Sequence, residues 1–312
     1  MTRIPTNGLE FTGERFTPEC VREIWYEHVH RYVLAAEWVR NKTVLDAACG
    51  EGYGSHYLAG RARRVSGVDI SAEAVDHARQ RYRADNLEFF QADCRKLPFA
   101  GAQFDCIVSF ETLEHLEEQE QLLAEFRRVL AADGFLLISS PDKAVYSRQL
   151  GNENPFHVRE LYRHELEELL ATHFPAVRLL GQKLAFNSMI WPLDAPPGPG
   201  DDPAARPPGF TWQRENQGTA ASATSPAGDA VYYLALCAAE DRFLPPSRSC
   251  LWLFDDAAES VYRHYHHEIR KNMQAGEVLM ARDSEIETLK AALKAAEDRI
   301  QASWWRRLVG GT

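Results

Sequence analysis

The sequence predicts an α/β fold in which a doubly wound sheet, mostly parallel with an antiparallel last strand, is followed by a C-terminal coiled-coil helix. Residues 41–186 alternate short β-branched runs with helical stretches, which is the pattern of βαβ units and a parallel sheet. Two later apolar runs, Ala176–Gly181 and Ala230–Cys237, are expected to be the closing pair of strands. From Leu279 onward, apolar residues recur seven apart, as in a coiled coil.

The first half of the sheet is predicted from three apolar runs and one helix start. Thr43–Ala47 is expected to be a short buried strand that leads into a glycine-rich turn and a helix, and Arg64–Asp69 the second strand. Ser71 then has the side chain of a helix N-cap, with Glu73 in the first turn. Leu87–Phe90 is expected to be the third strand.

The second half continues this alternation. Phe104–Ser109 is expected to be the fourth strand. Around Glu120–Leu130, apolar residues share one face of a predicted helix, which we expect Gly134 to end. Phe135–Ser139 is expected to be the fifth strand, and the whole succession indicates a parallel sheet.

Composition divides the chain into a predicted N-terminal helical lid (1–40), an α/β domain (41–255) and a C-terminal helix (256–312). Within the domain, residues 187–228 are rich in proline, glycine, alanine and serine. We expect this insertion to be mobile, to lack regular structure and to cover one end of the sheet, because proline and glycine disfavour helices and ladders.

The overall charge and the cysteines exclude several classes of protein. With 35 basic and 45 acidic residues the formal charge is −10, which argues against nucleic-acid binding. No run of 18 apolar residues predicts a transmembrane helix, and the N-terminus lacks the apolar segment of a secretory signal. The 6 cysteines are scattered without a CxxC pair, so we expect free thiols in a cytoplasmic protein, and no metal site.

A glycine-rich turn after the first strand carries the strongest functional signal. The segment Asp46–Gly54 has three alternating glycines, which let the backbone approach a ligand closely and turn into a helix. Asp46 either suits a ligand with an ammonium group or caps the following helix. Asp69 closes the second strand, where a carboxylate can accept both hydroxyl protons of a ribose. Asp93 follows the third strand, where it can meet an adenine amino group or start a turn.

Four motifs in register resemble the class I S-adenosylmethionine-dependent methyltransferases. They are Val44–Gly54, Val68–Ser71, Ala92–Cys94 and Phe110–Leu116, and the resemblance covers roughly residues 40–185. The resemblance implies a Rossmann-like sheet and S-adenosyl-L-methionine as the cofactor. It implies that Gly50 and Gly52 line the methionine portion and that Asp69 holds the ribose. It also implies that Ala92–Cys94 contact the adenine and that the residues around Phe110 and Glu111 close the pocket near the sulfonium. The candidate cofactor-binding residues are Arg15, Asp46, Ala48, Gly50, Gly52, Asp69, Ile70, Ala92, Asp93, Cys94, Phe110 and Glu111.

The flanking segments resemble methyltransferases of bacterial surface-polysaccharide clusters. These segments are Phe11–Glu19, Glu27–Tyr32 and Asn154–Leu161, together with the tail Ser303–Leu308. The resemblance implies methylation of a sugar hydroxyl in an O-antigen or related glycan. Two alternatives remain at this point: methylation of a terminal phosphate on such a chain, or a non-catalytic scaffold that keeps the methyltransferase fold.

A neutral alcohol is a poor nucleophile, so an O-methyltransferase is expected to position a base. His115 follows the fourth strand and His157 the fifth, so both belong to the sheet edge where ligands bind in open α/β folds. Either imidazole is a candidate catalytic base. Alternatively, His115 packs under the cofactor, and His157 anchors its loop through Glu160.

The C-terminal heptads predict that the chain forms a homo-oligomer. Leu279, Ile286, Leu293 and Ile300 fall seven apart, with charged residues between them. The alternative is a single amphipathic helix that packs on its own domain. The tip at residues 304–307 pairs two tryptophans with two arginines, which suits a polysaccharide-assembly partner or peripheral contact with the inner membrane.

Overall fold

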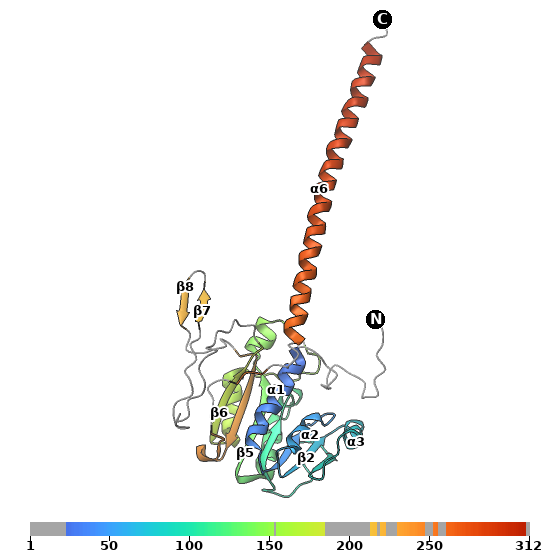
Figure 1. The fold of residues 1–312 in the computed structure, drawn as a ribbon. Coiled ribbons are helices and arrows are strands. Elements are labelled where there is room, and N and C mark those ends of the chain that lie inside the picture. Colours follow the sequence, from blue (N-terminus) through green and yellow to red (C-terminus); the bar gives the residue numbers. More distant parts are fainter. Residues whose placement is uncertain are drawn as a thin grey trace, which may run out of the picture. The chain divides into compact units, whose positions relative to one another are not determined.

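The computed structural model describes residues 23–152, 154–184, 213–216, 219–222, 230–246, 252–254 and 260–309. The chain divides into two units, residues 1–254 and residues 255–312, and each is described by itself (Figure 1). The first unit is an α/β domain and the second contains one long helix.

The α/β domain contains a seven-stranded sheet in the order β3-β2-β1-β4-β5-β9-β6. Its strands are β1 (Thr43–Ala47), β2 (Arg64–Asp69), β3 (Leu87–Gln91), β4 (Phe104–Ser109), β5 (Leu130–Pro141), β6 (Ala176–Gln182) and β9 (Tyr232–Ala238). Its helices are α1 (Glu23–Trp38), α2 (Tyr53–Ala59), α3 (Ala72–Arg81), α4 (Gln119–Val129) and α5 (Arg163–His173), with the short turns η1 (Leu113–His115), η2 (Ala144–Gln149) and η3 (Asp241–Phe243).

The predicted fold class is confirmed. Strands β1 to β5 pair in parallel, and β9 pairs antiparallel with both β5 and β6. The predicted helix start at Ser71 is also confirmed, because its hydroxyl accepts a hydrogen bond from the Ala74 N–H at 3.2 Å. The sheet is therefore doubly wound, mostly parallel, and completed by an antiparallel last strand.

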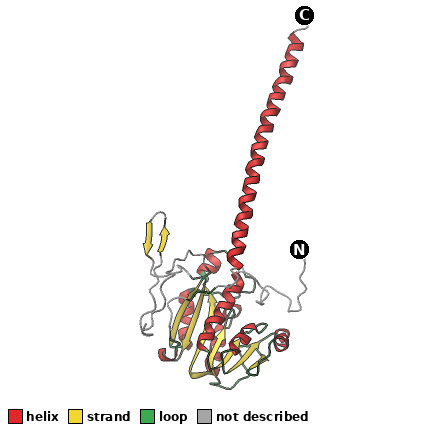
Figure 2. Cartoon of the chain, viewed as in Figure 1, coloured by secondary structure: helices red, strands yellow, loops and turns green. Residues whose placement is uncertain are grey.

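Helices cover both faces of the sheet, and successive strand residues alternate between two cores (Figure 2). On β1, Val44 packs in the core under α1, α2 and α3, whereas Leu45 packs in the core under α4 and α5. On β4, Val108 packs in the first of these cores and Ile107 in the second. This two-sided burial explains why the strands read as continuous apolar runs rather than as alternating ones.

The strand order reverses between β1 and β4, and this reversal positions the site. From β1 the chain builds outward through β2 to β3, and from β4 it builds in the opposite direction through β5. The connections that leave the carboxyl ends of β1 and β4 therefore diverge, which opens a crevice at that edge of the sheet.

Two predictions at element level are wrong. The helix ends at Val129 rather than near Gly134, because Leu130 already pairs with Phe104 and begins β5. Within the insertion, which we expected to lack regular structure, β7 (Gln213–Asn216) pairs antiparallel with β8 (Thr219–Ser222). This segment is poor in proline, so a ladder is compatible with its sequence. The remainder of 187–228 lies outside the described residues.

Four of the cysteines are buried free thiols, as expected: Cys49, Cys94, Cys106 and Cys237. Cys20 and Cys250 lie outside the described residues. The second unit contains α6 (Ser260–Val309), a helix of 50 residues, whose heptad residues Leu279, Ile286 and Leu293 are exposed. Across the part of the chain that the structure describes, no helix combines the length and apolar character needed to span a bilayer.

Candidate functional site

The glycine-rich turn between β1 and α2 forms one wall of the crevice. It departs from ordinary backbone at Ala48, Gly50 and Gly52, whose φ angles are 61°, 56° and 94°. The Cys49 N–H donates to the Val68 carbonyl at 2.8 Å, which ties the turn to the end of β2. These left-handed conformations fold the turn back over the sheet edge, which is why glycine recurs here.

A pocket of about 290 Å³ lies at the carboxyl ends of β1, β2 and β4. It brings together residues from all four predicted motifs, which are far apart in the sequence. The predicted residues that line it are Ala48, Gly50, Asp69, Ile70, Asp93, Cys94, Phe110, Glu111 and His115. Arg15 lies outside the described residues.

Asp69 is held by backbone groups at the end of β2. One carboxylate oxygen accepts from the Gly50 N–H at 2.9 Å and the other from the Ser71 N–H at 2.9 Å. The side chain is buried, with 7% exposure, and lines the pocket. A carboxylate oxygen can accept more than one hydrogen bond, so these backbone contacts are compatible with the predicted contact to ribose hydroxyls.

Asp93 lines the pocket and forms an ion pair with Arg95, which the sequence analysis did not predict. The Arg95 guanidinium donates to both carboxylate oxygens, with Nη2 2.7 Å from Oδ2, and also reaches Glu118 at 2.6 Å. These hydrogen bonds from Arg95 lower the pKa of Asp93. An adenine amino group would therefore meet an ionised acceptor.

Three predicted cofactor residues do not line the pocket, and each has a structural role beside it. Asp46 is fully buried below the turn, where its carboxylate accepts from Ser55 Oγ at 2.6 Å and Tyr32 Oη at 3.1 Å. Gly52 caps α2, and a Cβ there would lie 2.8 Å from Ala78. Ala92 packs in the core under α4.

Burial controls the ionisation of Asp46. It raises the pKa of the carboxyl to about 7, although the hydroxyls of Ser55 and Tyr32 that donate to it act in the opposite direction. Tyr32 does line the pocket. Asp46 thus contacts the pocket wall through Tyr32, and its contact with a ligand ammonium stays a prediction.

An ion pair closes the other side of the pocket. Glu111 has a φ of 52°, and its carboxylate lies 2.5 Å from Nη1 of Arg31, whose side chain is only 1% exposed. Arg31 also donates from Nε to Gln182 at 2.7 Å and stacks over the Tyr232 ring at 4.5 Å. Burial alone would raise the pKa of Glu111, but the Arg31 cation holds it below the ordinary value. Helix α1 thus contributes a buried cation to the site.

Two further pocket residues come from α1 and were missed as site residues. Burial lowers the pKa of His28 to about 4. The nearby Arg31 cation also lowers this pKa, whereas the Glu111 carboxylate raises it. Its imidazole is therefore neutral at pH 7. The ring of Tyr32 packs edge-on against Phe110 at 5.0 Å. Both residues belong to the segment Glu27–Tyr32, but the sequence analysis gave them no role in the site, because that role depends on how α1 packs on the sheet.

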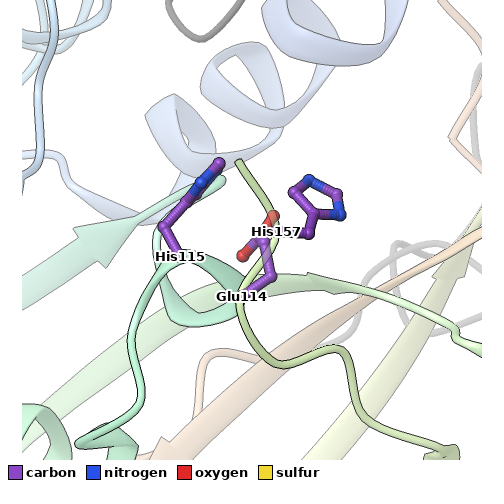
Figure 3. Close-up of side chains that lie close together, drawn as sticks. All are labelled: Glu114, His115 and His157. Atoms are coloured by element: carbon purple, nitrogen blue, oxygen red, sulfur yellow. The ribbon is translucent and has the colours of Figure 1, made fainter. Parts of the chain in front are cut away.

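The two candidate bases lie together with Glu114 (Figure 3). The rings of His115 and His157 are 5.1 Å apart, and His157 bonds Glu160 at 2.6 Å, as the loop-anchor alternative expected. His115 lines the pocket, whereas His157 lies behind it. Burial raises the pKa of Glu114 well above its ordinary value, and the neighbouring Glu111 acts in the same direction.

Comparison with known proteins places this geometry in context. Residues 45–138 match a family model described as a methyltransferase domain. A probable S-adenosylmethionine-dependent methyltransferase of Mycolicibacterium smegmatis is 38% identical over 169 residues, which cover 53% of this chain and 65% of that protein. A fatty-acid O-methyltransferase of the same species is 34% identical over 101 residues, which cover 32% of this chain and 37% of that protein.

A solved structure also aligns with the chain. The PH0226 protein of Pyrococcus horikoshii is 25% identical, with a TM-score of 0.47 over 56% of this chain and 95% of that one. The chain spans less than two thirds of the length of both curated relatives.

Proposed function

We propose that this chain, whose residues 45–138 match a methyltransferase-domain model, is a class I S-adenosylmethionine-dependent methyltransferase that methylates a sugar hydroxyl of a bacterial surface glycan. The domain match and a relative named as a probable S-adenosylmethionine-dependent methyltransferase support an enzyme that uses S-adenosyl-L-methionine.

The pocket fits this cofactor. Asp69 and Asp93 line the pocket, where their carboxylates can accept hydrogen bonds from ribose hydroxyls and an adenine amino group, and Ile70 and Leu116 add apolar wall. When bound, the cofactor supplies an activated methyl group on a sulfonium. The chain has to hold an acceptor oxygen in line with that group and to keep water away from it. Phe110 contributes to this exclusion, because its ring is buried against Tyr32.

The observation that carries the choice of a hydroxyl acceptor is the pair of imidazoles in the pocket wall. His115 and the neutral His28 both line the pocket, and a neutral alcohol has to lose its proton during transfer. The acceptor O–H bond breaks and its proton passes to a base or to water. The new O–C bond forms as the S–C bond breaks, leaving a methyl ether and S-adenosylhomocysteine.

The choice of a surface glycan is supported by the segments that resemble polysaccharide-cluster methyltransferases. Residues 27–32 supply His28 and Tyr32 to the pocket, and residues 154–161 supply His157, which contacts His115. Two of the segments that carry this resemblance therefore contribute residues to the pocket wall or to the cluster beside it, which supports the proposal. A relative named for O-methylation of fatty acids supports oxygen as the atom methylated.

The test is incubation of the full chain with methyl-labelled S-adenosylmethionine and the lipopolysaccharide or capsule fraction of the source organism. A methyl ether on a sugar keeps its label through mild alkali and through hydrofluoric acid, and yields a labelled monosaccharide. Label released by mild alkali would indicate a methyl ester, and label released by hydrofluoric acid a methylated phosphate. Either result would overturn the hydroxyl acceptor.

Variants separate catalysis from cofactor binding. His115→Ala should abolish turnover while calorimetry still detects S-adenosylmethionine binding. His56→Ala is a matched control, because His56 is exposed on α2 and does not line the pocket. A chain that binds the cofactor but labels no glycan, lipid or phosphate acceptor would favour a scaffold.

A further inference from the structure

Three potential metal ligands converge beside the cofactor pocket. Glu114 and His115 belong to η1, after β4, and His157 belongs to the segment between η2 and α5. One ligand atom from each of the three side chains lies within 4.8 Å of the others. Figure 3 shows the Glu114 carboxylate between the two imidazole rings. The convergence joins residues that are widely separated in the sequence.

Backbone hydrogen bonds hold the two segments together. The N–H groups of Val158 and Arg159 both donate to the Glu114 carbonyl, at 2.8 and 3.0 Å. The His157 N–H donates to the carbonyl of Asn154 at 3.1 Å, which fixes the turn that carries the imidazole. The cluster is therefore built into the fold rather than formed by long surface side chains.

Each imidazole is oriented through Nδ1, which leaves Nε2 as the ligand atom. His115 Nδ1 lies 2.9 Å from the Phe156 carbonyl, and His157 Nδ1 lies 2.6 Å from the Glu160 carboxylate. Because a carbonyl and a carboxylate accept hydrogen bonds, both Nδ1 atoms act as donors in these contacts, so Nε2 is the ring nitrogen that a metal ion would meet. Metal-binding histidines typically make this kind of outer contact.

Glu114 provides the second, independent observation. Its side chain is completely buried, and neither carboxylate oxygen has a hydrogen-bond partner among the described residues. Buried polar atoms are normally paired, and an unpaired buried carboxylate is costly. A cation between Glu114 and the two imidazoles would satisfy it.

We propose that Glu114, His115 and His157 bind a divalent transition-metal ion through one carboxylate oxygen and two imidazole Nε2 atoms. Two histidines and one carboxylate are a donor set for zinc, manganese or iron(II) that leaves coordination positions open. Tetrahedral bonds to zinc of about 2.0–2.1 Å place ligand atoms roughly 3.4 Å apart. The three atoms, which lie within 4.8 Å of one another, therefore have to move closer by up to about 1.4 Å when an ion binds. The sequence analysis expected no metal site, because the cysteines are scattered without a CxxC pair.

The role of the ion rests on the proposed function, although its binding does not. His115 lines the pocket, so an open coordination position next to it can receive the acceptor hydroxyl. A bound cation lowers the pKa of a coordinated hydroxyl and orients it. In this arrangement His115 and His157 act as ligands, and Glu160 is a positioning residue for His157.

The binding test is calorimetric titration of the metal-stripped full chain with Mn²⁺ and, separately, with Zn²⁺. We expect one ion per chain. Glu160→Gln should weaken binding by about 10- to 100-fold, as loss of an outer contact does, and Glu114→Gln and His157→Gln by more than that. His77→Gln should leave the affinity unchanged. It is a matched control because His77 also pairs with a carboxylate, Glu51, at 2.9 Å.

S-adenosylmethionine affinity and thermal unfolding show whether each variant is folded. If neither ion binds, the proposed site is wrong. It is also wrong if Glu114→Gln and His157→Gln bind the metal ion as tightly as the control His77→Gln. Turnover that survives metal stripping would overturn the role of the ion and leave the proposed function standing. Specific metal binding without glycan methylation would overturn the proposed function and leave the site standing.

Discussion

Arg31 and Glu111 form the most consequential side-chain pair in the pocket, because the guanidinium is 1% exposed. A buried charge that loses its partner is strongly destabilising. We therefore expect Arg31→Met, which leaves the Glu111 carboxylate without its cation, to lower the free energy of unfolding by about 3 kcal/mol. Urea denaturation of the wild type and the variant measures this change.

The control for that prediction is a surface pair of the same chemistry. Arg63 lies 3.2 Å from Asp105, but their side chains are 65% and 36% exposed. Exposed ion pairs contribute about 0–1 kcal/mol, so Arg63→Met should have a small effect. Equal losses in the two variants would show that burial of Arg31 does not matter to stability.

Cofactor affinity should depend on Asp69. Asp69→Ala removes an acceptor for two ribose hydroxyls and should weaken S-adenosylmethionine binding by about 1.5–3 kcal/mol, measured by calorimetry. Asp76→Ala is the control, because that exposed aspartate on α3 does not line the pocket. An unchanged affinity in Asp69→Ala would remove the ribose assignment.

Stability should depend on pH through Asp46. Burial raises its pKa from 3.8 to about 7, so between these values the folded state holds the proton more tightly than the unfolded state. The free energy of unfolding should therefore fall as pH rises through this window, by at most about 1.4 kcal/mol per pH unit, and then level off. Asp46→Asn should show a smaller slope between pH 5 and 7 in urea denaturation.

Asp76→Asn controls for the loss of an exposed carboxylate. If Asp46→Asn and the wild type lose stability with the same slope, Asp46 does not titrate in this window. The comparison is made without cofactor, because Asp46 contacts the pocket wall through Tyr32.

The pocket residues that could be predicted from the sequence are those fixed by short motifs at strand ends. Asp69 is the last residue of β2, and Gly50 and Asp93 come soon after β1 and β3, so the fold class alone places them at one edge. His28 and Arg31 could not be found in this way, because nothing in the sequence specifies how α1 packs over that edge. Glu114 was passed over because its buried, unpartnered state is a tertiary property.

At the scale of elements, the two ends of α2 offer a matched pair of glycines. A Cβ at Gly54 would lie 2.0 Å from the Tyr32 ring, which is buried and bonded to Asp46. A Cβ at Gly60 would meet its nearest neighbour at 3.4 Å, with an ordinary helical backbone. The third glycine of the turn thus serves the contact between α1 and α2 rather than a ligand.

We expect Gly54→Ala to lower the free energy of unfolding by about 1–3 kcal/mol through overpacking, and to weaken cofactor binding by displacing Tyr32. Gly60→Ala should be neutral or slightly stabilising, because it restricts the unfolded chain without a clash. Thermal unfolding and calorimetry of both variants measure these effects. A Gly54→Ala protein with wild-type stability would mean that α1 can move away freely.

Element order and type could be predicted from the sequence more reliably than element boundaries. Thr43–Ala47 and Arg64–Asp69 are buried along almost their whole length, and their predicted bounds agree with the structure at both ends. The start of β5 was misplaced because Leu130–Gly134 has no strand pattern of its own. The β4–β5 ladder begins where Leu130 pairs with Phe104, and its register shifts between Phe104 and Cys106. This pairing depends on the neighbouring strand β4.

At the scale of the whole molecule, we propose that α6 self-associates. A helix of 50 residues is about 75 Å long, and Leu279, Leu289 and Leu293 on it are 61–64% exposed. Exposed leucines at heptad spacing suit a paired helix. Removing residues 276–312 should therefore leave a cofactor-binding protein of lower oligomeric order, measured by sedimentation velocity.

Point variants sharpen that prediction. Leu289→Glu should lower the association state of the full chain, whereas Lys290→Glu, at a charged position between the seam residues, should not. If sedimentation gives the same number of chains per particle for the truncated and the full-length protein, α6 does not drive assembly.

The placement of β9 has a consequence for how the protein is made. This strand lies between β5 and β6, although it follows both in the chain. During synthesis, β5 therefore emerges with one backbone edge unpaired, and β6 has no partner in the sheet until β9 arrives. Unpaired apolar edges are prone to intermolecular pairing. Because Gln182 at the end of β6 also bonds Arg31, the buried cation of the pocket reaches its final setting only after the ribosome has passed residue 238.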